Sequence, residues 1–276
     1  MASKEEDGGQ ELMLVFPQLV TGAAALYPLT KRLARRTVFN DLSDGSTVFL
    51  EDPDAPALDW EIRAKGLTAA EGAAIEALFD ATGGRWKTFT FLDPAGNLLA
   101  RSEEFDAAVW SNGPLMQLTT GITDPFGTTR ATRAVNAGFA VQGVMQALAV
   151  PGTFQYCLSV WVKSQAESRV TLALSTAGAI VTRAFALSGT WMRLSLSGNL
   201  AESTEDVTFG VQLDAGASVD LFGMQVEAQP AASAYKRTGA GCGVRSNARF
   251  DDDRIRVTAQ GTDVYDAVIR ITSAGS

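Results

Sequence analysis

The hydrophobic pattern along most of this chain is the two-residue alternation that is typical of β-strands. Gly, Ser, Asn and Asp separate the apolar runs at short intervals, and short strands at such spacing are typical of β-sandwiches and jelly rolls. The central strand candidates are residues 156–162, 170–174, 191–196, 207–213 and 219–222, and the outer ones are 37–39, 47–50, 58–62, 86–91, 255–258 and 267–271.

One segment departs from this alternation and predicts an α-helix over residues 68–82. Thr68 and Glu71 have the spacing of a capping box, in which each side chain bonds to the backbone of the other residue. Ile75, Leu78 and Phe79 follow at helical spacing, and Gly83 supplies a left-handed stop. A second, weaker pattern predicts another helix over residues 29–36.

The order of these segments predicts a domain inserted into another domain. Residues 97–238 form a strand-rich block that can close by itself, whereas residues 11–96 and 239–276 are each incomplete alone. We therefore expect a discontinuous outer domain with 97–238 inserted in one of its loops, because insertion is tolerated where chain ends meet at a surface. Residues 1–10 are charged and Gly-rich and predict a flexible leader.

Composition excludes several functional classes. The 276 residues include no histidine, which removes Ser-His-Asp catalysis, imidazole zinc sites and a histidine pH switch. The formal charge of -8 argues against a broad duplex-DNA surface. Two cysteines are too few for a disulfide scaffold and are expected to be free thiols. No signal or membrane-spanning segment is visible, so we expect synthesis in a cytoplasm and no membrane insertion.

The outer segments resemble the distal-tail, or tail-hub ring, proteins of siphophages and gene-transfer agents. The residues that carry this resemblance are Phe16-Pro17, 66–71, the helix 73–80, the strand segment 84–94 that contains Phe-Thr-Phe-Leu-Asp-Pro, and the returning segment 247–257. The resemblance covers roughly half the chain. It implies a β-sandwich "belt" domain that assembles as a ring, typically a hexamer, which joins the tail tube protein to the baseplate hub protein in the virion.

The central block resembles a different family, the jelly-roll modules of the carbohydrate-binding type that recur in phage tail and fibre proteins. The matching segments are 97–105, Trp110, 123–127, 158–163, 190–194, 219–230 and 233–235. The resemblance implies a module with two facing antiparallel sheets. The predicted fold class is therefore mainly β: a discontinuous β-sandwich belt domain with one α-helix, plus an inserted jelly roll.

Candidate ligand-binding residues are aromatic, because sugar recognition sets an aromatic ring against the apolar face of a pyranose. We select Trp110, which lies between polar segments and is expected to be loop-exposed, and Tyr235. Trp161 and Trp191 are expected to pack in or against strands.

No catalytic residue, cofactor or metal site is predicted. Glu103-Glu104, and Asp206 with Asp220, are carboxylate pairs of the kind a glycosidase needs, but nothing in the sequence places a pair across a cleft. Asp251-Asp252-Asp253 lacks the ligand spacing of a calcium loop and is expected to be a solvated turn.

The basic cluster Lys31, Arg32, Arg35 and Arg36 is the sharpest charge feature. Like charges at i,i+4 repel each other in a helix, so we expect the cluster to meet an acidic partner, with residues 51–54 of a neighbouring subunit as the candidate; nucleic acid is the alternative. Splitting the chain at 101 and 238 puts 9 basic and 11 acidic residues (-2) in the insert and 14 and 20 (-6) outside it. An acidic lumen of this kind would let DNA pass without binding it.

The leading hypothesis is a structural, non-enzymatic phage tail-tip protein whose inserted module projects outward toward host-surface glycans. The alternative is a host-recognition adhesin whose main role is carbohydrate binding. A glycan depolymerase is the third hypothesis. Ring assembly, glycan binding by residues 97–238, and release of reducing ends would separate the three.

Overall fold

The computed structural model describes residues 13–51, 57–165, 168–201 and 206–274. The predicted leader, residues 1–10, and residues 52–54 of the predicted acidic partner segment lie outside the described residues. The described chain is mainly β with the single helix α1, and its antiparallel sheets pack as sandwich-like layers, so the predicted fold class is confirmed. Cys157 and Cys242 are free thiols, as predicted.

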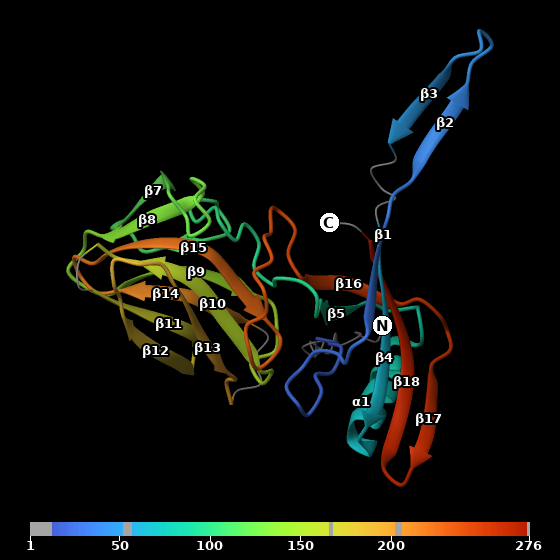
Figure 1. The fold of residues 1–276 in the computed structure, drawn as a ribbon. Helices are drawn as coiled ribbons and strands as arrows, with labels where there is room; N and C mark the ends of the chain where they lie inside the picture. The colour runs from blue at the N-terminus through green and yellow to red at the C-terminus, as the bar shows by residue number, and fades with distance from the viewer. Residues whose placement is uncertain (1–12, 52–56, 166–167, 202–205, 275–276) are drawn as a thin grey trace, which may run out of the picture.

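A six-stranded antiparallel sheet forms one body of the molecule (Figure 1). Its strands are β1 (Leu29–Ala34), β4 (Ala57–Leu67), β18 (Val264–Ala274), β16 (Val244–Phe250) and β5 (Phe89–Leu92), with β17 (Arg256–Gly261) also paired to β18. Trp60 and Ile62 of β4 are buried on one face together with Ile269 of β18, whereas the alternating residues face away from this core.

The helix α1 (Ala69–Thr82) packs its buried Ile75 and Leu78 against this core. The predicted capping box is confirmed, since the Glu71 N–H donates to Thr68 Oγ1 and the Thr68 N–H donates to Glu71 Oε2. Gly83 ends the helix in the left-handed conformation at φ 61°. Glu71 also accepts the Val20 N–H at 2.9 Å, which fixes the amino-terminal segment to the helix.

The predicted helix over residues 29–36 is wrong, because Leu29–Ala34 form the strand β1. Its backbone pairs with β4 from Leu29 opposite Ile62 to Ala34 opposite Ala57, so tertiary pairing overrides a weak local helix preference. The expected i,i+4 repulsion within the basic cluster is therefore also wrong, since positions four apart in a strand lie about 13 Å from each other.

Beyond β1 the chain continues into a two-stranded hairpin that we call the arm, residues 37–51. It consists of β2 (Thr37–Asp41) and β3 (Thr47–Glu51), and Figure 1 shows it projecting away from both bodies of the molecule. Phe39 and Phe49 pair across the two strands yet remain 65% and 70% exposed. The arm therefore presents apolar side chains that nothing in the described chain covers.

The second body is a sandwich of two five-stranded antiparallel sheets. The first has the order β13-β10-β15-β8-β7 and the second β12-β11-β14-β9-β6. The bounds are β6 Ser111–Asn112, β7 Met116–Ile122, β8 Ala131–Asn136, β9 Gln142–Leu148, β10 Tyr156–Lys163, β11 Arg169–Ser175, β12 Ile180–Ala186, β13 Met192–Gly198, β14 Val207–Leu213 and β15 Ser218–Glu227. Inward-facing residues of both sheets share one hydrophobic core. The domain boundaries at 97 and 238 stay a prediction.

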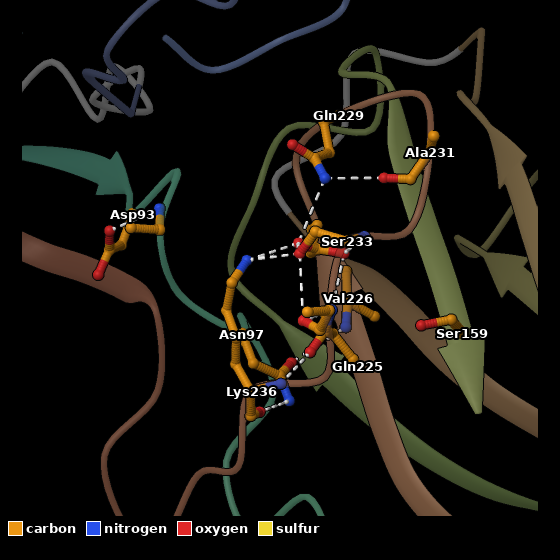
Figure 2. A network of polar contacts seen from close by, with 12 residues as sticks. Asp93, Asn97, Ser159, Gln225, Val226, Gln229, Ala231, Ser233 and Lys236 are labelled. Carbon is orange, nitrogen blue, oxygen red and sulfur yellow. Dashed lines mark hydrogen bonds and ion pairs between the residues drawn. The ribbon is translucent and has the colours of Figure 1, made fainter. Parts of the chain in front are cut away.

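A buried amide, Asn97, holds the junction between the two bodies (Figure 2). Its Oδ1 accepts the N–H groups of Leu99 and Val226, and its Nδ2 donates to the carbonyls of Met224 and Lys236, all at 3.0–3.2 Å. The chain leaves β5 and returns toward β16 at this point.

Gln18 makes a second tie between the bodies. Its Nε2 donates to the Gln155 carbonyl at 2.9 Å, and its Oε1 accepts the Gln155 N–H at 2.7 Å. The segment before β1 is thereby bonded to the sandwich as well as to α1.

Replacing Asn97 with Ala should lower the free energy of unfolding by about 2–4 kcal/mol, because buried backbone groups would lose their partners. Urea unfolding followed by tryptophan fluorescence measures this, with the exposed Asn199→Ala as the matched control. Equal midpoints for the two variants would show that the junction does not depend on this amide.

Candidate functional site

The outer face of the first sandwich sheet carries a row of aromatic and charged side chains. In β10, Leu158, Val160 and Val162 point into the core, so the alternating Trp161 and Lys163 lie on the opposite face. Trp161 pairs across the sheet with Arg193 of β13 and Phe222 of β15.

Tyr235 covers part of this face. Its ring lies 5.6 Å from that of Phe222, and a Cβ at Gly223 would meet it at 3.0 Å, which explains the glycine with φ 63° beneath the ring. Its hydroxyl lies 2.8 Å from Ser102 Oγ and donates to Glu103 Oε1 at 3.0 Å. Burial raises the pKa of this phenol, so Tyr235 stays protonated and acts as a fixed, half-buried cover.

Glu103 is the centre of a buried ion-pair cluster. Arg130 Nη1 lies 3.0 Å from both carboxylate oxygens, and Arg237 Nε lies 3.0 Å from one of them. Glu104, the other member of the predicted pair, is bonded to Arg101 instead. The two carboxylates thus have separate arginine partners.

The loop around Asp124 presents an aromatic ring to solvent. Burial opposes ionisation of Asp124, but hydrogen bonds from Thr128 and from the Phe126 N–H outweigh it, so the pKa of this carboxyl lies below its usual value. Phe126 is 60% exposed and makes edge contacts with Trp161 at 6.0 Å and Phe222 at 5.8 Å. The hydrogen bonds to Asp124 therefore fix the loop in a conformation that leaves Phe126 at the surface.

Glu227 is a second buried carboxylate on the same face, 2% exposed. It accepts hydrogen bonds from Lys236 Nζ at 2.7 Å, Gln225 Nε2 at 2.7 Å and the Ser233 N–H at 2.9 Å. Burial raises the pKa of Glu227, but these bonds outweigh the burial and hold it below the ordinary value for a glutamate. The ionised carboxylate fastens the loop after β15 to the sheet.

The open part of the face is a pocket at its end, about 520 Å³ in volume, which we call the end pocket. Arg133 holds the buried Asp220 with two bonds of 2.7 and 3.1 Å, and Lys163 Nζ lies 3.6 Å from the same carboxylate. Lys163 Nζ also lies 5.0 Å from the Trp191 ring centroid. The pocket thus offers ammonium, guanidinium and carboxylate groups, while Trp191 contacts Lys163 without being one of the lining residues.

Two further groups in the end pocket are unengaged within the described residues. Arg169 is exposed at the start of β11 and has no ion pair there. Ser168 Oγ is buried and has no hydrogen-bond partner among the described atoms. With Asp214 on the opposite wall, the lining has three cations and two carboxylates, and it includes donors and acceptors for a hydroxylated ligand.

The expected exposure of Trp110 is wrong. Its side chain is 5% exposed, its Nε1 donates to the Arg101 carbonyl at 3.1 Å, and its ring packs on Phe105 with centroids 5.1 Å apart. The polar residues around it form turns that fold the indole inward, so the ring has no open face for a ligand. Trp161 and Trp191 lie half-buried on or beside strands, as expected.

One residue of the basic cluster, Lys31, has an acidic partner within its own chain. Lys31 forms an ion pair with Asp93 of its own chain and lies 5.7 Å from the Trp60 ring, whose Nε1 donates to Asp93 Oδ1 at 3.1 Å. Arg32, Arg35 and Arg36 are exposed on or just after β1, at the base of the arm. Their interface role stays a prediction, while the Lys31 side chain already has an intrachain partner.

Sequence reasoning missed the end pocket. Lys163 directly follows the alternating run 156–162, and its place on the outer face follows from that alternation. Arg133 belongs to β8 and Arg169 begins β11, and no local signal connects them because strand pairing alone brings them together.

Comparisons with known proteins give only structural likenesses. No family model matches the chain, and no curated protein matches it. A solved CBM61 module in complex with β-1,4-galactotriose (13% identity, TM-score 0.38) aligns with 47% of this chain over 97% of its own. The CBM22-1 xylan-binding domain of Paenibacillus barcinonensis Xyn10C (16%, 0.40) aligns with 49% of this chain over 96% of its own.

The enzymatically active domain of a tailspike protein of bacteriophage CBA120 (12% identity, TM-score 0.38) aligns with 48% of this chain. The aligned part is 21% of that tailspike domain. All three TM-scores lie below 0.5.

The described residues contain neither a membrane-spanning helix nor a metal-binding cluster. No helix there is both long and apolar enough to cross a membrane. No group of three or more Cys, Asp or Glu side chains is placed there to hold a metal ion, Asp251, Asp252 and Asp253 included.

Replacing Glu227 with Gln should lower the free energy of unfolding at pH 7 by about 2 kcal/mol, because bonds to a charged acceptor are lost. Since the folded-state pKa lies below the ordinary value for a glutamate, the wild-type carboxylate stabilises the fold at pH values above that ordinary value. This advantage should be lost as the pH falls through the folded value. Urea unfolding at several pH values measures it, with the more exposed Glu104→Gln as the control; a pH-independent difference would contradict this account.

Proposed function

We propose that this protein binds carbohydrate through the end pocket of its sandwich. The observation that carries the proposal is the pocket itself, an open hollow whose lining includes Arg133, Lys163, Arg169 and Asp214, together with a Ser168 hydroxyl that has no partner among the described atoms. Carboxylates accept and guanidinium groups donate hydrogen bonds to sugar hydroxyls. The resemblance of residues 97–238 to carbohydrate-binding modules supports the same ligand class.

The ion pairs of the buried carboxylates also support binding rather than catalysis. Asp220 is neutralised by Arg133 and Lys163, and Glu103 by Arg130 and Arg237. A glycosidase needs two carboxyl groups that are free to face the scissile bond across a cleft, whereas the oxygens of Asp220 and Glu103 are bonded to arginines of the same chain. Our proposal therefore assigns no catalytic step.

Replacing Arg169 with Ala should weaken carbohydrate binding about tenfold or more, because one charged hydrogen bond is removed. Arg169 is exposed and begins β11, so its loss leaves the fold intact. Arg183→Ala is the matched control, since Arg183 is exposed on the neighbouring strand β12 outside the end pocket. Isothermal titration of the full chain with a panel of soluble polysaccharides measures the effect. Failure of the wild-type chain to bind any of them, or equal affinities of the two variants, would contradict the proposal.

A second candidate function is favoured by the arm: a structural subunit of a phage tail tip. In this proposal the discontinuous domain, residues 11–96 and 239–276, forms a ring, typically a hexamer, between the tail tube protein and the baseplate hub protein. DNA passes through its lumen, and the inserted sandwich points outward. The motifs that resemble distal-tail proteins support this candidate.

The arm supports assembly because it is a hairpin that would be unstable without a partner. An isolated two-stranded hairpin is marginally stable in water, and exposed contiguous apolar side chains mark interaction surfaces. Phe39 and Phe49 form one face of the arm, and the other carries Val48 and Leu50, which are also exposed. Both faces need a partner, and several copies on one ring would add avidity to weak glycan sites.

Replacing Phe39 and Phe49 together with Ser should abolish self-assembly, because the apolar face that the arm offers to a partner is removed. Mass photometry and native mass spectrometry of the full chain measure it. Phe139→Ser is the matched control, since Phe139 is 100% exposed on the sandwich. Assemblies of normal size in the double variant, or a wild-type chain that is monomeric at every concentration, would defeat the second candidate.

A further inference from the structure

We propose that the arm of one copy binds a groove on the sheet body of a second copy, which we call the arginine groove. The inference rests on the proposed self-assembly and adds the surface that receives the arm. It follows from two surfaces of this chain that complement each other in charge and in apolar character.

The arginine groove is a hollow of about 710 Å³ over β4, β17 and β18. Glu61 and Arg63 alternate with the buried Ile62, so the groove lies on the sheet face opposite the core that α1 covers. Its lining includes four arginines, Arg63, Arg254, Arg256 and Arg270, and two carboxylates, Glu61 and Asp252, which give a net charge of +2.

The arginines of the groove differ in their engagement. Arg63 and Arg270 are both bonded to Glu61, at 2.7 and 3.3 Å. Arg254 and Arg256 are exposed and have no ion pair within the described ranges of the chain. The groove therefore keeps two cations open to an acidic partner, and the half-exposed Val268 adds an apolar patch to its floor.

The arm has the complementary composition. Residues 37–51 contain Asp41, Asp44 and Glu51 and no lysine or arginine, so the arm carries a net charge of -3. Asp41, Phe39, Phe49 and Glu51 share one face, because Phe39 pairs with Phe49 and Thr37 with Glu51 in the hairpin register. One face of the arm thus combines two aromatic rings with carboxylates, as a basic and partly apolar groove requires.

The arm cannot fill the groove of its own chain. It leaves the sheet at Ala34 and Ala57, one end of the β1–β4 ladder, and projects outward from there (Figure 1). The groove lies beside β17, whose Arg256 pairs with Val268 well along β18 from that end. The partner is therefore a second copy, and the contact is heterologous, of the kind that repeats around a ring or along a filament.

Charge reversal tests the contact in the full-length chain. An arm variant (Asp41→Lys, Asp44→Lys) and a groove variant (Arg254→Glu, Arg256→Glu) should each assemble at least tenfold more weakly than wild type, measured by analytical ultracentrifugation. An equimolar mixture should regain assembly, because each arm then meets a groove of opposite charge on the other variant. A chain with all four changes should assemble alone.

Matched controls and distinct failures make the test decisive. Asp106→Lys and Arg183→Glu reverse exposed charges on the sandwich and should leave assembly unchanged. If the wild-type chain assembles and the groove variant does so equally well, the arginine groove is not the receptor, although self-assembly stands. If the wild type never associates, both the contact and the assembly are wrong, while carbohydrate binding by the same samples is judged separately.

Discussion

The hydrogen bonds at the junction are the constraint on which the rest of the molecule depends. The chain leaves the sheet body after β5 and returns to it before β16, and these two passages lie side by side because the Asp93 N–H donates to the Gly243 carbonyl at 2.8 Å and the Gly243 N–H donates to that of Asn97 at 2.7 Å. Asn97 then ties the first residues of the insert to β15. With its two ends fixed at one place, the sandwich adds to the sheet body without interrupting its core. Each body can therefore present its own binding surface.

The buried carboxylates of the sandwich and those of the arm differ in whether they are paired with cations. On the sandwich, the buried carboxylates Glu103, Asp220 and Glu227 are each bonded to cations of the same chain, so the exposed Arg169 and Asp214 are the charges of the end pocket that have no ion pair among the described residues. On the arm, the bonds that Asp41 and Asp44 make within the described part of the chain go to neighbouring hydroxyl and backbone groups. The acidity of the arm remains available to a partner, and its aromatic rings require one.

Much of the fold could be predicted because its signals are local. The capping box of α1 and five of the ten sandwich strands follow from residue type and period, whereas β6, β7, β8, β9, β12 and β16 are not predicted because their alternation is weak. The segment 29–36 was assigned to a helix because its pairing with β4 is not a local property. Among the candidate site residues, the ligand-binding role of Tyr235 stays a prediction, whereas the expected exposure of Trp110 is wrong because turns fold its ring inward onto Phe105. The end pocket needs residues from several strands, which only the three-dimensional pairing brings together.

The central claim is that this molecule has one surface for a ligand, the end pocket, and another, the arm, that is complete only when a second copy covers it. Hydrogen–deuterium exchange of the full chain tests the latter most directly, because amides of an uncovered hairpin exchange quickly. We predict fast exchange for residues 37–51 in dilute protein and slow exchange at concentrations where the chain associates, with the sandwich core unchanged. Equally fast exchange of the arm in the monomer and in every associated form would contradict the account.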